Sequence, residues 1–283
     1  MMKRIQRCRE QMNQEIRKKY WVPLEGRHKA GAWEALDAGY TESHRAYHTW
    51  EHVARLLEKL SEFSDLSTRS DIIAVSVFWH DVVYRTQNLD GGPRPDYENV
   101  RDSGELFRQY TLLNKSDADA VHDLIMATSN HLQARAEKHY YAGFADDLDL
   151  FLDLDLSSLA LPWDEFVDDL ARIRTEFSWA PEVVFCSIQL QILDNYAKDD
   201  VRLYRRAETS RKWRDAARAN LNRCIKKKLP NFLPYRGNAK AWLEQIGKAN
   251  SRKRRQDLKK IGLRSIIFLA PRHKFGGEGV AVR

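Results

Sequence analysis

Cysteine is scarce in this chain of 283 residues. The three cysteines, Cys8, Cys186 and Cys224, lie far apart, and no Cys-x-x-Cys pair occurs. An odd number at such spacing argues against a disulfide framework and against a thiolate zinc finger. We therefore expect a protein of a reducing compartment, with the cytoplasm as its location.

Long apolar segments are also missing. No uninterrupted apolar stretch approaches the ~20 residues that a membrane-spanning helix needs. Residues 1–7 are charged and contain no apolar segment, so the sequence predicts no secretory signal. The hydrophobic content of 43% is ordinary for a globular protein, and the length allows one large domain with an appendage. We expect no membrane partner.

Charge is distributed unevenly along the chain. Residues 226–283 hold 16 basic and three acidic side chains, whereas residues 1–225 hold 31 basic and 37 acidic ones. This asymmetry predicts a domain over 1–225, with its core at about 40–200, and a basic, partly disordered extension over 226–283. The basic cluster at 251–260 is a candidate for binding nucleic acid or for nuclear localisation, which makes the nucleus the alternative location. Nothing in the sequence indicates an oligomeric state.

The hydrophobic pattern predicts an all-α fold. Helices are indicated over 30–38, ended by Gly39, and over 48–63, and further helices open at Pro162 and Pro181. Residues 149–156 alternate apolar and acidic side chains as a strand would. Because no second strand candidate exists to pair with this segment, we expect a helix there with Asp155 or Asp153 directed inward.

A histidine and an aspartate end the most apolar segment of the chain. Residues 72–79 predict a buried helix, and His80 and Asp81 follow directly. Such groups are costly to bury unless they are paired or bind a metal. Adjacent helical side chains point about 100° apart, so the two can share a partner only where the helix loosens or where the partner sits over its end. A divalent cation accepts imidazole nitrogen and carboxylate oxygen together.

Three further positions carry groups of the same kind. His48 and His52 are four residues apart, and His52 shares a stripe with Leu56 and Leu60, which directs it toward the core. His131 closes a later helix, and Asp153 and Asp155 follow in the next. The sequence thus offers histidines and carboxylates from separate helices of one bundle.

The order and spacing of these residues resemble the HD superfamily of metal-dependent phosphohydrolases. The resemblance covers roughly residues 15–225 and is closest to the branch described as predicted metal-dependent HD phosphohydrolases. Four motifs carry it: Tyr47-His48-x-x-x-His52-Val53, Phe78-x-His80-Asp81-x-x-Tyr84, Ala127-Thr128-x-x-His131 and Phe151-Leu152-Asp153-x-Asp155-Leu156. It implies a compact HD-type helical bundle over 1–225 that hydrolyses a small phosphorylated metabolite or nucleotide through a metal-activated water.

Carried over by position, the resemblance implies a set of metal ligands: His52, His80, Asp81 and Asp155. His48 is the alternative to His52, and Asp153 the alternative to Asp155. His131 could bind a second metal or the substrate phosphate. Since mixed imidazole and carboxylate ligands occur without thiolates, the expected metal is Mn²⁺, Fe²⁺, Mg²⁺, Co²⁺ or Ni²⁺.

Further site residues follow from the implied reaction. Glu98 or His48 could act as general base, and Arg45, expected at the pocket rim, or Arg85 could neutralise phosphate charge. The family usually carries Asp-Asn-Glu and then Ser-Ala after the HD helix, whereas this chain has Asp96-Tyr97-Glu98-Asn99 and then Ser103-Gly104. These departures keep an alternative open, a catalytically weak HD-fold binding module whose basic tail binds RNA or another anionic partner.

Overall fold

The computed structural model describes residues 11–134 and 145–226. Within these ranges the chain forms helices and no strand, as the sequence predicts; two isolated β-bridges join loop residues. None of the described helices has both the length and the apolar character needed to span a membrane. The basic cluster at 251–260, and with it the predicted extension beyond residue 226, lies outside the described residues.

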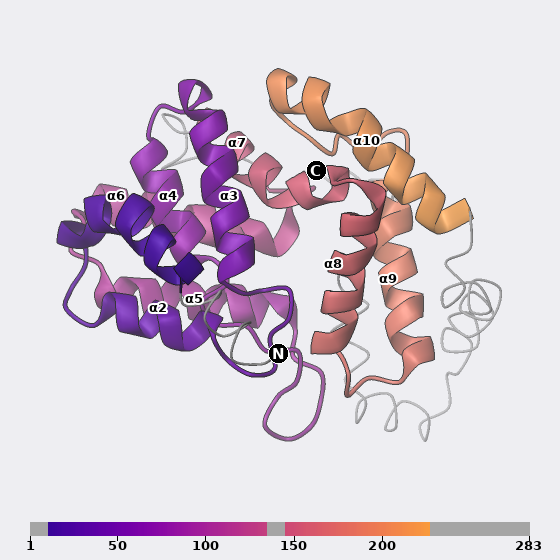
Figure 1. Ribbon diagram of the computed structural model, residues 1–283, viewed down its shortest axis with the longest axis horizontal. Helices are drawn as coiled ribbons and strands as arrows, with labels where there is room; N and C mark the ends of the chain where they lie inside the picture. Colours follow the sequence, from indigo (N-terminus) through magenta and orange to yellow (C-terminus); the bar gives the residue numbers. More distant parts are fainter. Residues whose placement is uncertain (1–10, 135–144, 227–283) are drawn as a thin grey trace, which may run out of the picture.

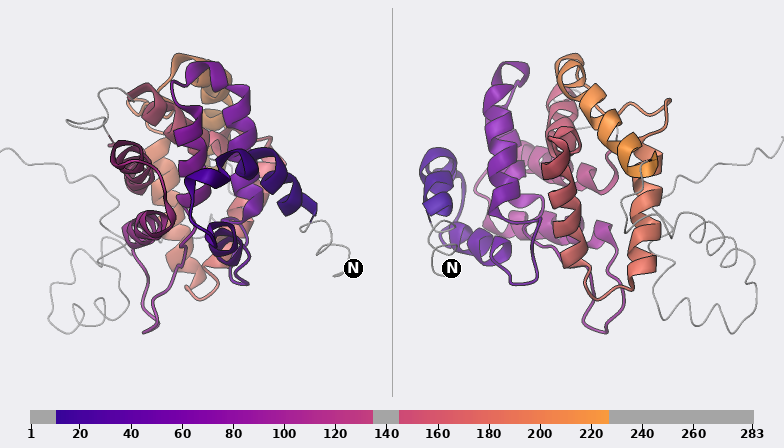
Figure 2. Two further views of the ribbon diagram at one scale, coloured as in Figure 1. Left: turned by 90° about the vertical axis from the view of Figure 1, so that its left-hand side faces the viewer. Right: turned by 45° about the vertical axis from the view of Figure 1, so that its right-hand side comes forward.

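The helices form a bundle with two sides (Figure 1). The N-terminal side holds η1 (Arg17–Trp21), η2 (Val22–Arg27), α2 (Ala32–Tyr40), α3 (Trp50–Glu62), η3 (Ser64–Leu66), α4 (Ser70–Trp79), α5 (Asp96–Tyr110), α6 (Lys115–Ala127) and η4 (Thr128–Asn130). The other side holds α8 (Trp163–Glu176), α9 (Glu182–Tyr196) and α10 (Ala207–Lys226). Between them run α7 (Ala145–Asp155) and η6 (Leu156–Ala160). The two further views keep α8, α9 and α10 grouped together (Figure 2).

Helix α4 is the centre of the N-terminal side. It packs against α3, α5, α6 and α7, and seven of its ten residues are buried. A helix that is apolar on all sides must be shielded from water on all sides, and these four neighbouring helices shield α4. Asp147 of α7 accepts the backbone N–H groups of Thr68 and Arg69, which fixes the start of α4 against α7.

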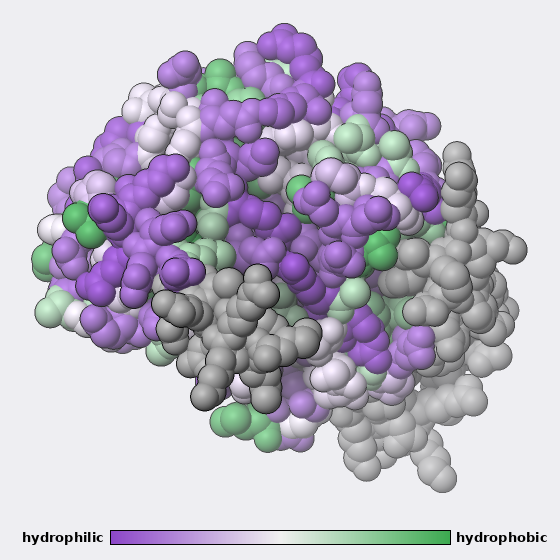
Figure 3. Space-filling model, viewed as in Figure 1, coloured by the Kyte–Doolittle hydropathy of each residue, from purple (hydrophilic) through white to green (hydrophobic). Residues whose placement is uncertain are grey.

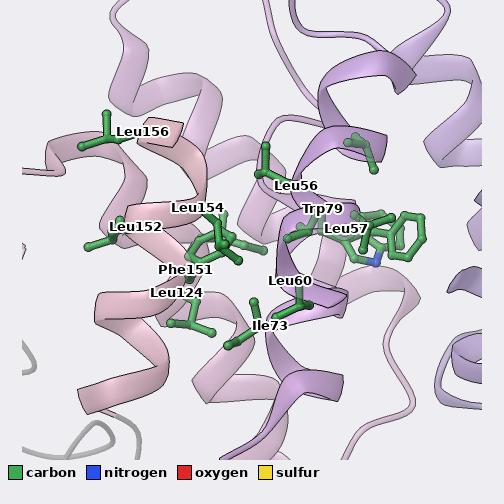
Figure 4. Packing of buried hydrophobic residues seen from close by; sticks show 14 of the residues in the cluster. Leu56, Leu57, Leu60, Ile73, Trp79, Leu124, Phe151, Leu152, Leu154 and Leu156 are labelled. Atoms are coloured by element: carbon green, nitrogen blue, oxygen red, sulfur yellow. The ribbon is translucent and has the colours of Figure 1, made fainter. Parts of the chain in front are cut away.

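The core joins α3 to α7. Leu56, Leu57 and Leu60 of α3 face Phe151 and Leu154 of α7, and all five are buried (Figure 4). The helical prediction for residues 149–156 is confirmed, because α7 covers this segment as far as Asp155. The leucines of α7 are buried in the core, and its aspartates point in other directions around the helix. This packing brings the C-terminal end of α7 close to the first turns of α3.

Two predicted boundaries differ from the structure. Gly39 does not end α2, which continues to Tyr40. A Cβ at Gly39 would lie 2.5 Å from the carbonyl oxygen of Val82, so this glycine permits a close approach of α2 to the turn after α4. His48 lies outside α3, because Thr49 is the N-cap and accepts the backbone N–H of Glu51 through its side chain. His48 and His52 therefore do not share a helix.

Candidate metal centre

The end of α4 places His80 and Asp81. His80 is the C-cap residue of the buried helix, and the chain turns away at Asp81. The His80 side chain is only 1% exposed, whereas Asp81 opens onto a cavity. A partner over the end of the helix can thus meet both side chains, which is one of the two arrangements that the sequence allows.

The four ligands that the resemblance implies come together from three segments. The Nε2 atoms of His52 and His80 lie 3.2 Å apart. Asp81 Oδ2 lies 3.0 Å from His80 Nε2, and Asp155 Oδ1, from the end of α7, lies 3.3 Å from His52 Nε2. Each histidine also approaches the second carboxylate, since His52 lies 3.7 Å from Asp81 and His80 lies 3.7 Å from Asp155.

The three shortest separations, 3.0–3.3 Å, fit ligands of one divalent cation. Two ligand atoms bound to one transition metal at about 2.1 Å lie roughly 3.0–3.5 Å apart, depending on the angle between the bonds. The Nδ1 atom of His80 lies 2.9 Å from the Val77 carbonyl oxygen, and since a carbonyl only accepts, Nδ1 carries the hydrogen. The second nitrogen then presents its lone pair to the cluster. His52, Asp81 and His80 form a group whose ligand atoms all lie within 4.8 Å of one another.

A proton competes with such a cation for the ligand nitrogens of His52 and His80. Burial lowers the pKa of His80, but the neighbouring Asp81 and Asp155 carboxylates outweigh burial and raise this pKa to about 9. Burial also lowers the pKa of His52, and there burial prevails. The buried Asp81 and Asp155 carboxylates face these two imidazoles, so a positive charge at the cluster is favourable, and a proton or a divalent cation supplies it.

His48 stands beside this group and is held by a glutamate. Its Nδ1 lies 2.7 Å from Glu176 Oε2, and its Nε2 lies 3.9 Å from Asp81 Oδ2. The other oxygen of Glu176 accepts the backbone N–H groups of Ala46, Tyr47 and His48. Burial raises the pKa of Glu176, but the His48 charge and these hydrogen bonds outweigh it and lower the pKa to about 2. Glu176 is 128 residues from His48 and belongs to no motif, so no local pattern points to it.

His131 lies on the opposite side of Asp155. Its Nε2 is 2.7 Å from Asp155 Oδ2, so the carboxylate faces His52 with one oxygen and His131 with the other. His131 also lines the cavity. The structure therefore brings His131 into the site, next to the place where a second metal or a phosphate would bind.

Asp153 is not available as a ligand. Its carboxylate is fully buried and accepts the backbone N–H groups of Arg205 and Arg206 and the hydroxyl of Thr209. Arg205 and Arg206 directly precede α10 and Thr209 lies in its first turn, so Asp153 holds the start of this helix. Two residues along a helix correspond to about 200°, so Asp153 and Asp155 point in different directions. The alternative that placed Asp153 at the metal is wrong.

The two arginines expected to meet phosphate lie elsewhere. Arg45 is not at the pocket rim: its side chain is fully buried and donates to the carbonyl oxygens of Asp81 and Val82 at 2.7 and 2.8 Å, and it pairs with Glu42. Arg85 has an exposed side chain and does not line the cavity. Glu98 is likewise absent from the cavity wall and lies 3.7 Å from Arg94. The structure thus does not bring Arg85 or Glu98 to the candidate site.

A cavity of about 340 Å³ opens from the metal group. Asp96, the first residue of α5, lines it. The N-cap residue of α5 is Pro95, which makes no side-chain cap hydrogen bond. Surrounding protein raises the pKa of the Asp96 carboxyl above its usual value, and the Asp81 charge raises it further.

Comparison of the chain with known protein families, with curated proteins and with solved structures found no match. The resemblance to the HD superfamily therefore stays a prediction, based on the four motifs.

Proposed function

We propose that this protein is a metal-dependent phosphohydrolase that acts on a small phosphorylated substrate. The observation that carries the proposal is the convergence of His52, His80, Asp81 and Asp155 at one end of a cavity, with ligand atoms 3.0–3.7 Å apart. This donor set suits Mn²⁺, Fe²⁺, Mg²⁺, Co²⁺ or Ni²⁺. When bound, such an ion polarises a phosphoryl oxygen and lowers the pKa of a coordinated water.

The residues of the chain would then move the protons. His48, with Nδ1 fixed by Glu176, presents Nε2 toward the metal group and is placed to accept a proton from the attacking water. The carboxylate of Glu176 stabilises the imidazolium that forms. Asp96, which lines the cavity at the start of α5, is the candidate to donate a proton to the leaving oxygen.

The test is the metal content of the purified protein with and without Asp81. We expect about one transition-metal ion per wild-type chain and phosphatase activity with Mn²⁺. Asp81→Ala should lose both, because it removes the carboxylate between His80 and His48. Asp149→Asn on α7, whose carboxylate pairs with Arg205 outside the metal group, is the control and should keep both. Activity retained in Asp81→Ala would overturn the assignment.

A further inference from the structure

The cavity beside the metal group is walled mainly by apolar side chains. One wall comes from α8, α9 and the turn between them, and it presents Ile173, Phe177, Trp179, Val184, Ile188 and Ile192. The indole N–H of Trp179 donates to the Thr86 hydroxyl, and Thr86 donates in turn to the Glu176 carbonyl. The apolar wall is thus joined through Glu176 to the segment that holds His48. By contrast, the molecular face in Figure 3 is mostly hydrophilic, with apolar residues scattered over it.

The cavity lining as a whole contains few basic side chains. Apart from histidines, Arg94 is the one basic side chain among the described residues that line the cavity. Its guanidinium already donates to Asn99 Oδ1 at 2.7 Å and pairs with Asp102 and Glu98. Three carboxylates, Asp81, Asp96 and Asp155, line the cavity as well. One divalent cation balances two of them, so a second or third phosphate would meet no unpaired cation on the described wall.

The cavity lining also offers few hydrogen-bond partners for the sugar and the base of a nucleotide. Of the uncharged polar side chains in the described lining, Tyr47 donates to Ser158 and Thr128 donates to the Ile125 carbonyl. Ser158, which only accepts from Tyr47, together with Tyr84 and Gln189, remains for the hydroxyls and ring nitrogens of a nucleoside. Polar groups that enter a site without partners lose their hydration at a cost, so this wall disfavours nucleosides relative to hydrocarbon.

We propose that the substrate is a monophosphate ester of an apolar alcohol, alkyl or aryl, rather than a nucleotide. The inference rests on the proposed phosphohydrolase function and names its substrate class. At about 30 Å³ for each water-sized group, a cavity of 340 Å³ holds a body on the order of ten non-hydrogen atoms. The phosphoryl group would meet the metal group, and the hydrocarbon would lie along α8 and α9.

The first test is a homologous series of alkyl phosphates, from ethyl to octyl, with the Mn²⁺-loaded full-length protein. We expect kcat/KM to rise by up to about fourfold for each added methylene until the cavity is filled. Octyl phosphate should exceed AMP by 100-fold or more. A flat series, or AMP as the better substrate, would overturn the apolar substrate class and leave the phosphohydrolase function standing.

Binding of n-octylphosphonate separates the two proposals if no ester is hydrolysed. Tight calorimetric binding of this phosphonate to the Mn²⁺-loaded protein, with ethylphosphonate binding at least tenfold more weakly, would support the apolar pocket while the hydrolytic function fails. Equal or absent binding of the two phosphonates would overturn the pocket as well.

A pair of variants on α9 locates the hydrocarbon. Ile188→Gln places an amide in the apolar wall and should lower the octyl-to-ethyl ratio of kcat/KM about tenfold. Leu190→Gln is the matched control, because Leu190 lies on the same helix, is partly exposed and does not line the cavity. An unchanged ratio in Ile188→Gln would contradict the placement along α9. A ratio of two rates on one variant is insensitive to the fraction of folded protein.

Discussion

The Oε2 atom of Glu176 lies 2.7 Å from Nδ1 of His48, and the other carboxylate oxygen accepts three successive backbone N–H groups from residues 46–48. One buried carboxylate thus fixes both the backbone and the ring of His48. The second ring nitrogen is left facing Asp81, toward the metal group.

Glu176→Gln should lower kcat about 100-fold with little change in KM. The amide keeps a similar shape but removes the charge that stabilises an imidazolium at His48, so proton transfer in the transition state becomes harder. Metal content, measured alongside, should stay at the wild-type level because Glu176 contacts none of the four ligands. Glu165→Gln, on the exposed side of the same helix α8, is the control. A kcat within threefold of the wild type would show that His48 is not the base.

Gly39→Ala should destabilise the protein and weaken metal binding together. The added Cβ would lie 2.5 Å from the Val82 carbonyl oxygen, and backbone cannot move aside cheaply. We expect a loss of about 1–3 kcal/mol in the free energy of unfolding, measured in urea. Because Val82 follows Asp81, the shift should also raise the metal dissociation constant. Gly26→Ala meets no atom within 4 Å and should cost no more than about 0.5 kcal/mol. Equal stabilities of the two variants would contradict the close approach.

His28 should make the fold sensitive to mild acid. It is buried, its Nδ1 donates to the Leu24 carbonyl, and its Nε2 accepts from the Trp79 indole. Burial lowers its pKa from 6.5 to about 4. The unfolded chain therefore binds a proton more readily, and the stability contributed by neutral His28 is complete above about pH 6.5 and is lost as the pH falls toward 4. The two pKa values correspond to a difference of about 3 kcal/mol.

Urea unfolding at pH 7.5 and pH 4.5 would measure this effect. His28→Gln removes the titrating group, so its free energy of unfolding should fall less between the two pH values than that of the wild type. His122→Gln, at a partly exposed histidine on α6, should keep the wild-type pH dependence. If the free energy of unfolding of His28→Gln fell as much between pH 7.5 and pH 4.5 as that of the wild type, His28 would not be the source of the acid sensitivity.

Local pattern was enough to predict the helical class and the segments that meet at the site. The periodicity of α3 predicts that His52 faces the core, and the absence of a strand partner predicts that residues 149–156 are helical; both are confirmed. What local pattern could not supply was the set of long-range hydrogen bonds. The place of Arg45 just before the helix expected at residues 48–63 predicts a position at the pocket rim, but its partners include backbone carbonyls 36 and 37 residues away.

The two aspartates of α7 illustrate the same limit. Asp153 and Asp155 have the same chemistry and near-identical neighbours, and only the position of α10 separates a helix cap from a candidate ligand. Glycine often ends a helix, which predicts a helix end at Gly39, but here the glycine allows the backbone of Val82 to approach α2 closely. Glu176 and Asp96 owe their roles to the fold alone.

Arg45 joins the two halves of the candidate metal centre through backbone carbonyl groups and contacts none of the ligand atoms. Its guanidinium donates to the carbonyl of His48, just before α3, and to those of Asp81 and Val82, just after α4. The ligand geometry is thus held by contacts between protein groups, and an incoming ion has little chain to order. We expect such a preorganised site to keep the same geometry whichever ion it binds. The metal-free protein could therefore be loaded with each candidate ion in turn, and differences in activity would then reflect the chemistry of the ion.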